Sequence, residues 1–247
     1  MTEKIWNNVR GAGRLVALLV LIAGSAFDYA ARRSHRQDAG AKARWLQSVC
    51  RSALLVLAVE VESRGEPARG AIIAANHLGY LDILVLASLT PVVFVAKREV
   101  RSWPLFGWFA EKAGTRFIDR NRRGDVARIA DEIGPVITER LTVVVFLEGT
   151  STDGADVLPF KPSLLEPAVQ NGWPVIPAGI SYKTSAGRRV THEVCWWGDM
   201  TLAPHLWNFT TLPWVRARVV WGEAVAAGGD RKVLAVRLRE LVSRLRA

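Results

Sequence analysis

Short apolar runs and segments with helical spacing alternate along most of the chain. Six runs rich in β-branched and aliphatic residues predict β-strands, at residues 54–62, 71–75, 91–96, 141–147, 174–181 and 215–220. Several of them are apolar throughout, which is typical of strands buried on both faces of a sheet. Apolar residues recur with helical spacing at residues 81–89, 125–139 and 234–245. This alternation predicts an α/β fold, with a central, mostly parallel sheet flanked by helices, and the last helix is expected to pack on the sheet.

The amino-terminal region departs from this pattern. Residues 15–27 form an apolar run whose helix would be about 20 Å long, shorter than the ~30 Å hydrocarbon core of a bilayer. A second apolar stretch follows at residues 45–60. We therefore expect a helical hairpin of two short helices lying in the membrane interface, with Trp6, Tyr29 and Trp45 at headgroup depth. An uncleaved signal peptide and a single tilted span are the alternatives.

Composition is consistent with one catalytic domain behind these helices. The chain has 247 residues, of which 50% are hydrophobic and 23% charged, so it can bury a sizeable core. No repeat or low-complexity linker divides it, and we expect membrane-associating helices in residues 1–52 and one domain in residues 53–247. The two cysteines form no CxxC or Cys/His cluster, which excludes a disulfide scaffold and gives no support for a metal site.

The net charge of +10 indicates an acidic partner. The charge is concentrated in residues 1–44, 97–123 and 216–247, each with eight basic and three acidic residues. Ten tryptophans favour a membrane surface as that partner, because tryptophan prefers the interface between water and hydrocarbon. No zinc-finger, helix-turn-helix or RNA-binding signature supports the alternative, so we expect an anionic membrane surface and no nucleic acid.

Candidate acid–base chemistry follows the run at residues 71–75. His77 comes directly after that strand, and Asp82 lies near the start of the next helix. The two side chains can meet only if His77 is in the loop and Asp82 in the first helical turn, with Gly79 as the flexible position between them. The carboxylate would then hold one imidazole nitrogen and leave the other as a general base. Taken alone, the pattern also fits a capping histidine and an aspartate at a helix start.

Three further blocks follow in order along the chain: GTRFIDR at residues 114–120, FLEGT at 146–150 and VIP at 175–177. With NHLGYLD at residues 76–82, they resemble the glycerolipid acyltransferase family typified by bacterial lysophosphatidic acid acyltransferase. That family has the blocks NHxxxxD, GxxFIDR, FPEGTRS and a VIP-type block in the same order. The resemblance covers roughly residues 70–185.

The resemblance implies direct acyl transfer without an acyl-enzyme. His77 would remove the proton from the acceptor hydroxyl, Asp82 would fix the imidazole, and the hydroxyl would attack the thioester of acyl-CoA or acyl-carrier protein. The residues that match the substrate-binding positions are Asn76, Gly114, Phe117, Arg120, Glu148, Gly149, Thr150 and Lys161. Arg120 also suits bidentate capture of phosphate or carboxylate on chemical grounds. No cofactor or metal is expected, and the implied location is the cytoplasmic face of a bacterial inner membrane.

Two departures from the family pattern bear on the acceptor. Leu147 replaces the proline of FPEGTRS, and Ser151 replaces its arginine. The acceptor that the family implies first is lysophosphatidic acid (1-acylglycerol-3-phosphate), acylated to phosphatidic acid in phospholipid biosynthesis. Residues 148–165, however, are similar to the lyso-ornithine lipid acyltransferase branch, which O-acylates lyso-ornithine lipid to ornithine lipid. There, Asp153 and Asp156 could attract the ornithine ammonium.

A serine hydrolase is the alternative of another class. Residues 149–153, GTSTD, nearly match the GxSxG nucleophile elbow, with Ser151 as the nucleophile. The final glycine of the elbow is missing, and Gly154 and Pro159 stand where its helix should follow. The acyltransferase interpretation is therefore preferred.

Overall fold

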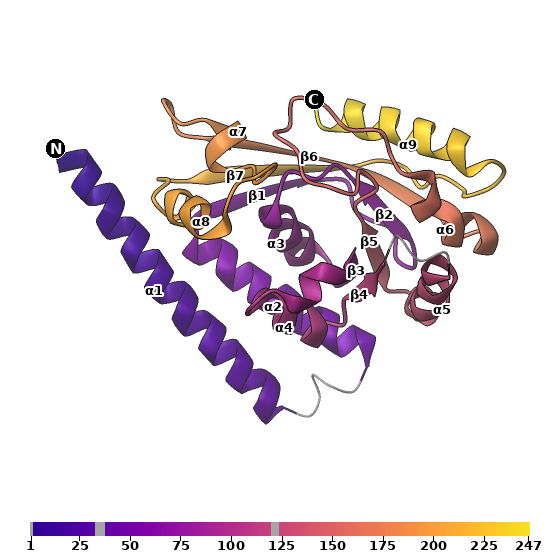
Figure 1. Cartoon of the computed structure of the whole chain (residues 1–247), viewed down its shortest axis with the longest axis horizontal. Helices are drawn as coiled ribbons and strands as arrows, with labels where there is room; N and C mark the ends of the chain where they lie inside the picture. The colour runs from indigo at the N-terminus through magenta and orange to yellow at the C-terminus, as the bar shows by residue number, and fades with distance from the viewer. Residues whose placement is uncertain (1, 33–37, 120–123) are drawn as a thin grey trace.

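One seven-stranded sheet forms the centre of the protein (Figure 1). The computed structural model describes residues 2–32, 38–119 and 124–247. The strands are β1 Val59–Arg64, β2 Ile72–Ala75, β3 Val92–Lys97, β4 Arg116–Ile118, β5 Thr142–Val145, β6 Val175–Thr184 and β7 Val215–Trp221. They lie in the order β1-β7-β6-β2-β5-β3-β4, and all neighbours are parallel except the antiparallel pair β6–β7. The predicted α/β fold with a mostly parallel sheet is confirmed.

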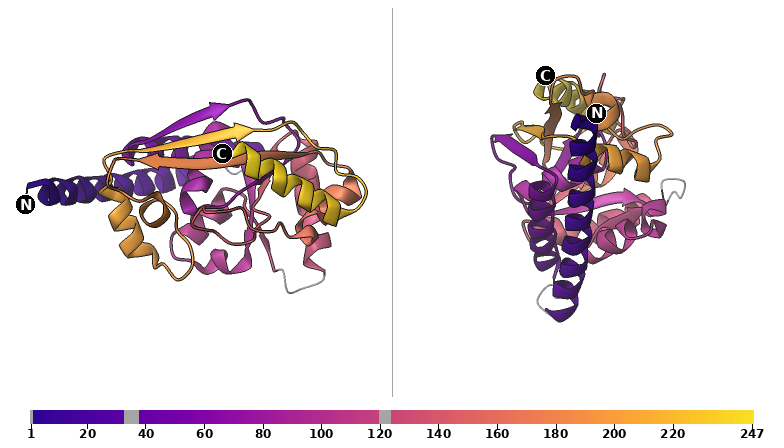
Figure 2. Two further views of the ribbon diagram at one scale, coloured as in Figure 1. Left: turned by 90° about the horizontal axis from the view of Figure 1, so that it is seen from above. Right: turned by 90° about the vertical axis from the view of Figure 1, so that its left-hand side faces the viewer.

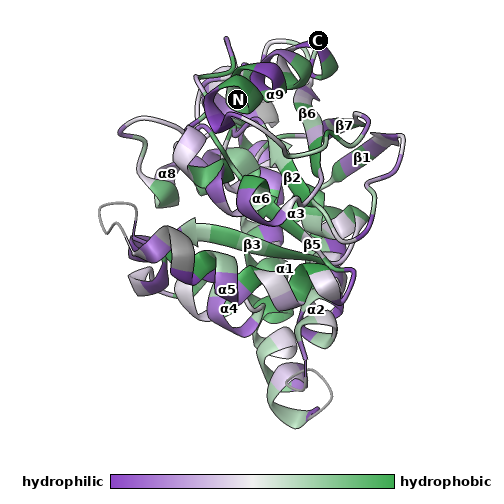
Figure 3. Cartoon of the chain, turned by 90° about the vertical axis from the view of Figure 1, so that its right-hand side faces the viewer, coloured by the Kyte–Doolittle hydropathy of each residue, from purple (hydrophilic) through white to green (hydrophobic). Residues whose placement is uncertain are grey.

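Helices cover both faces of this sheet (Figure 2). They are α1 Thr2–Ala31, α2 Ala39–Val56, α3 Tyr80–Leu89, α4 Phe106–Lys112, α5 Asp125–Thr138, α6 Glu166–Asn171, α7 Val190–Glu193, α8 Leu202–Thr210 and α9 Arg231–Leu245, with the 3-10 helices η2 Arg98–Ser102 and η3 Pro162–Leu165. Buried side chains of α2, α3 and α8 form one core with the sheet, and those of α5, α6 and α9 form another. Strand β2 serves both, because Ile73 and Ala75 belong to the first core and Ile72 and Ala74 to the second. Figure 3 shows the resulting hydrophobic central strands.

The first predicted strand begins later than its sequence pattern suggests. Residues 54–56 continue α2, and β1 begins only at Val59. Leu54 is buried in the first core, and Ala58, with a φ of 52°, separates the helix from the strand. Packing of the helix thus prevails over the β propensity of this aliphatic run. Helix α2 also runs across residue 52, where the sequence suggested a domain boundary.

Helix α1 is longer than its apolar run predicts. It covers Thr2–Ala31, about 45 Å at the helical rise, because no proline interrupts the residues on either side of the run. It contacts α2 and α8, and Arg14 donates to the carbonyl oxygens of Thr210 and Pro213 at 3.1 Å each. Among the described residues, Lys4–Ala31 is long and apolar enough to cross a membrane, and only 11% of its most apolar window is buried. The predicted pair of helices is present, but the predicted short first helix is wrong. The predicted headgroup placement is also wrong for Tyr29 and Trp45, which are buried in the first core, whereas Trp6 is exposed.

Helix α9 packs its apolar face on the sheet, as predicted. Leu234, Leu238 and Val242 are buried in the second core, and the helix contacts β6 and η3. Val233 and Val236 are exposed by 67% and 59%, so they belong to the solvent face of the same helix. In Figure 1, α9 lies on the far side of the sheet from α1, α2 and α4.

Candidate active site

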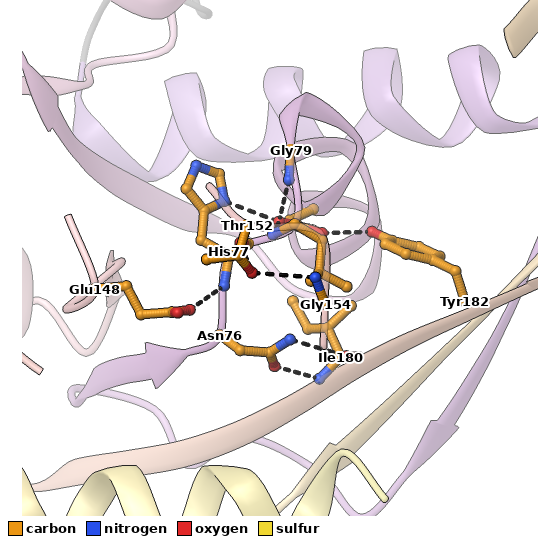
Figure 4. A network of polar contacts seen from close by, with 10 residues as sticks. Asn76, His77, Gly79, Glu148, Thr152, Gly154, Ile180 and Tyr182 are labelled. Atoms are coloured by element: carbon orange, nitrogen blue, oxygen red, sulfur yellow. Dashed lines mark hydrogen bonds and ion pairs between the residues drawn. The ribbon is translucent and has the colours of Figure 1, made fainter. Parts of the chain in front are cut away.

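The turn between β2 and α3 carries the candidate acid–base pair (Figure 4). Nδ1 of His77 lies 2.8 Å from Oδ2 of Asp82, with His77 before the helix and Asp82 in its first turn. This is the arrangement that the five-residue spacing requires. Gly79 has a φ of 154°, and a Cβ there would lie 2.9 Å from the backbone nitrogen of Trp196. Any side chain at position 79 would therefore push the turn away from its neighbour.

Asp82 is fully buried, and four donors surround its carboxylate. Besides His77, Oδ2 accepts hydrogen bonds from the backbone N–H groups of Leu78 at 2.6 Å and Gly79 at 3.0 Å, and Oδ1 accepts one from the Tyr182 hydroxyl at 2.6 Å. Because the carboxylate only accepts, Nδ1 of His77 carries the shared proton. The lone pair of the imidazole is then on Nε2, the ring nitrogen that can act as a base.

Tyr182 belongs to the site, although no sequence pattern predicts its position there. It lies on β6, one hundred residues beyond Asp82 in the chain and five residues beyond the VIP block that begins the strand. Burial and the nearby Asp82 carboxylate raise the pKa of Tyr182 well above its ordinary value. The phenol is therefore protonated at any working pH and remains a donor to Asp82.

We expect Tyr182→Phe to lower kcat by about tenfold, because a hydrogen bond to a charged group contributes about 1.5–3 kcal/mol. The KM for the acceptor should change little, since Tyr182 is buried behind Asp82. Tyr80→Phe is the matched control, because the Tyr80 hydroxyl lies nearby but pairs with Nδ1 of His205 at 3.0 Å. Steady-state kinetics of both variants decide the matter, and equal kcat values for them would contradict a role for Tyr182.

The side chains of Glu148 and Asn76 stabilise the turn that carries His77 through hydrogen bonds to backbone groups. Oε1 of Glu148 accepts the His77 backbone N–H, and Oε2 accepts that of Leu158, both at 2.7 Å. Burial raises the pKa of Glu148, while these two backbone hydrogen bonds act in the opposite direction. The Asn76 amide donates to the carbonyl of Ile180 at 3.0 Å and accepts its N–H at 2.7 Å. The polar atoms of both side chains are therefore hydrogen-bonded to backbone groups.

The loop after Glu148 closes over the same turn. Thr152 donates its backbone N–H to the His77 carbonyl at 2.9 Å, and the Phe146 ring stacks on the imidazole with centroids 3.9 Å apart. Gly149 is buried, with its N–H on the carbonyl of Phe146, whereas Thr150 is exposed. In the described chain, no helix follows Ser151 before η3. The strand–turn–helix that a nucleophile elbow needs is missing, so the serine hydrolase alternative is wrong.

The remaining residues predicted to bind substrate lie outside this turn. Gly114 is buried in the turn before β4, with a φ of 81°, and Phe117 is half-buried on β4. Lys161 is exposed, and its backbone N–H donates to the Leu147 carbonyl at 2.9 Å. Arg120 lies outside the described residues.

Three adjacent parallel strands end at one edge of the sheet, and each end carries a charged or ionisable side chain. His77 follows β2, Glu148 follows β5, and Lys97 is the last residue of β3. This is the edge where α/β sheets bind ligands. Lys97 is exposed and was missed from sequence, because it ends an apolar run that indicates only a buried strand. Its ammonium can meet an anionic group brought to this edge.

The fold and the site geometry are those of an α/β protein with a histidine–aspartate pair at the carboxyl edge of its sheet, an arrangement suited to general-base chemistry. The sequence profile of the Acyltransferase family matches residues 57–181. The chain belongs to this family and is an O-acyltransferase.

Its relatives fall into two groups by name. The chain is 34% identical over 235 residues to a lyso-ornithine lipid O-acyltransferase of Rhodobacter capsulatus, covering 83% of each chain. It is 36% identical over 195 residues to that of Brucella abortus, covering 71% of this chain and 70% of the relative. It is 31% identical over 184 residues to a 1-acyl-sn-glycerol-3-phosphate acyltransferase of Neisseria meningitidis, covering 72% and 71%.

A solved structure has the same fold. The crystal structure of the 1-acyl-sn-glycerophosphate acyltransferase PlsC from Thermotoga maritima superposes with a TM-score of 0.72. The match covers 98% of this chain and 95% of that chain at 22% sequence identity. The shared architecture thus includes the amino-terminal helices as well as the sheet.

Proposed function

We propose that this enzyme transfers a fatty acyl group from acyl-carrier protein or acyl-CoA to the hydroxyl of a lysolipid at a membrane. The observation that carries the proposal is the His77–Asp82 pair at 2.8 Å, with Asp82 held by three further donors. Nε2 of His77 takes the hydroxyl proton as the oxygen attacks the thioester carbonyl. The C–S bond then breaks, and the imidazolium returns the proton to the leaving thiolate. No metal or cofactor takes part.

The surrounding residues divide into positioning and binding groups under this proposal. Glu148 and Asn76 hold the turn that carries His77, because their polar atoms are used on backbone groups. The cations Lys97, Lys161 and Arg120 provide charge for the anionic headgroup of the acceptor. Gly149 and Thr150 lie in the loop that covers the turn, while Gly114 and Phe117 lead into β4.

The membrane location is supported by the surface of α1. Seven large apolar side chains of this helix are exposed by 55% or more: Ile5, Trp6, Val9, Val16, Leu19, Val20 and Phe27. Such an exposed apolar surface is unfavourable in water and favourable in lipid. We place the enzyme on the cytoplasmic face of a bacterial inner membrane, where acyl thioesters and lysolipids meet.

Two acceptors fit this chemistry, and we favour lyso-ornithine lipid over lysophosphatidic acid. The relatives with 34% and 36% identity carry the lyso-ornithine name, and Ser151 removes a guanidinium suited to phosphate. The two aspartates considered for the ornithine ammonium give less support. Asp156 pairs with Arg239 at 3.1 Å, and Asp153 accepts the N–H of Ala155 within its own turn.

A competition assay tests the proposed function. Purified enzyme is given acyl-carrier protein thioester with lyso-ornithine lipid and lysophosphatidic acid present together, and the products are identified by mass spectrometry. We expect ornithine lipid to predominate, because residues 148–165 resemble that branch and lack the arginine. Phosphatidic acid as the main product would make lysophosphatidic acid the acceptor, and acylation of neither would overturn the proposed function.

A further inference from the structure

A cluster of large apolar side chains is exposed in the segment after η2 and in the first turn of α4. Trp103, Leu105, Phe106 and Trp108 are exposed by 38% to 43%, within six consecutive residues. We refer to residues 103–108 as the aromatic edge. Scattered apolar residues are normal on protein surfaces, but a contiguous patch of this kind usually marks an interaction site.

The backbone of the aromatic edge is fixed in a strained form that keeps these side chains outside. Leu105 has a φ of 64°, in the left-handed region that a branched aliphatic residue rarely occupies. Gly107 permits the close packing, because a Cβ there would lie 2.2 Å from the carbonyl oxygen of Arg101. Strain at Leu105 and exposure of its side chain both oppose folding in water, and a conformation that combines them suggests function.

The aromatic edge lies between α1 and the catalytic turn. The Trp108 ring packs edge-on against Tyr29 of α1, with centroids 6.3 Å apart. At its other end, the Trp103 ring packs edge-on against Trp196 at 5.8 Å. The backbone N–H of Trp196 donates to the carbonyl of Leu78, the residue after His77, at 2.8 Å. Ring contacts and this backbone hydrogen bond therefore connect α1, through the aromatic edge, to the turn that carries His77.

The charge around the aromatic edge matches an anionic lipid surface. In the described part of this segment, residues 97–119, five side chains are basic and three are acidic. The side chains of Arg98 and Arg101 are 60% and 61% exposed. Arg98 lies 3.5 Å from the carboxylate of Asp119, and Arg101 lies 3.6 Å from that of Glu111. Tryptophan beside arginine is the composition expected at headgroup depth.

We propose that the aromatic edge is a second membrane-contact surface, which enters the headgroup layer of the bilayer that α1 contacts. It holds the catalytic turn at the lipid surface, so that a lysolipid reaches His77 without leaving the membrane. This inference rests on the proposed function, because it assumes a lipid acceptor and a membrane-bound α1. It differs from it in assigning interfacial catalysis to residues that lie outside both the amino-terminal helices and the catalytic pair.

The test compares the full-length enzyme with Leu105→Asn/Phe106→Ser. Asparagine tolerates a positive φ, so the variant should fold, and thermal unfolding checks this. Val233→Ser/Val236→Ser on α9 is the matched control, since it removes two apolar side chains that are even more exposed and lie on the other side of the sheet. Binding is measured by flotation with vesicles of phosphatidylcholine and phosphatidylglycerol. Turnover is measured with long-chain lysolipid in these vesicles and with a short-chain lysolipid in free solution.

We expect the aromatic-edge variant to bind vesicles about tenfold more weakly and to turn over vesicle-borne acceptor about tenfold more slowly. Turnover of the soluble acceptor should match wild type, and the α9 control should match wild type throughout. Unchanged vesicle turnover in the variant would overturn the inference. Equal losses on the soluble acceptor, seen with acyl-carrier protein but not with acyl-CoA, would also overturn it and make the patch a docking site for the donor protein. A wild type that binds vesicles through the aromatic edge but acylates no acceptor would refute the proposed function alone.

Discussion

His77→Ala is expected to reduce acyl transfer by roughly 10²- to 10⁴-fold in kcat, the usual contribution of a positioned general base. The alanine leaves Asp82 with its backbone donors and Tyr182, so the turn keeps most of its hydrogen bonds. The imidazole is also 19% exposed and contributes one stacked face to Phe146. The loss should therefore appear in catalysis and leave the fold and vesicle binding nearly unchanged.

His192→Ala is the matched control for this variant. His192 is an exposed histidine on α7, whose Nδ1 pairs with the Thr191 hydroxyl at 2.8 Å. Both variants are assayed for product by mass spectrometry and for folding by thermal unfolding. Wild-type turnover by a folded His77→Ala enzyme would exclude His77 as the base.

Asp82→Asn is expected to reduce kcat by about 10²-fold or more, for a reason that the structure makes specific. The N–H groups of Leu78 and Gly79 both point at the Oδ2 position, so the amide must place its oxygen there. His77 then keeps its Nδ1–H donor, and the amide NH₂ meets Tyr182, whose hydroxyl can turn to accept. What the variant loses is the negative charge that stabilises the imidazolium as the proton moves.

The orientation and the charge can be separated by a second substitution. Asp82→Ala removes both and should be slower than Asp82→Asn, whereas Asp199→Asn, in an exposed loop, should match wild type. The three variants are compared by kcat with the acceptor saturating. Equal kcat values for Asp82→Asn and Asp82→Ala would show that holding the His77 imidazole in place contributes nothing to kcat. Wild-type turnover in Asp82→Asn would exclude the carboxylate from the mechanism.

Much of the fold could be read from the sequence because its strands are buried on two faces. The apolar runs at residues 71–75 and 141–147 are typical of strands in the middle of a sheet, and they form β2 and β5 there. The His77–Asp82 contact was also predictable, since only a loop-to-first-turn placement allows it. The sequence predicts the strand β7 but not its place in the sheet, where it lies between β1 and β6 and runs antiparallel to β6.

The parts that sequence could not supply depend on contacts between distant segments. Tyr182 meets Asp82 only because β6 lies beside β2, and the Tyr182 position carries no motif. The carboxylate of Glu148, a residue that the sequence places among the substrate-binding positions, accepts backbone N–H groups of His77 and Leu158, and no local pattern predicts these two contacts. Helix α1 extends beyond the apolar run at residues 15–27, because a helix propagates through polar residues once its first turns have formed.

Direct acyl transfer to a lipid hydroxyl is tested most directly by following one labelled acyl group. Purified enzyme is mixed with labelled acyl-carrier protein thioester, first without and then with lysolipid, and free thiol, protein mass and labelled lipid are measured together. The account predicts no thiol release and no change in protein mass before lysolipid is added, followed by one O-acyl lipid formed for each thiol released. Thiol release without lysolipid, or a protein that gains the mass of the acyl group, would contradict it.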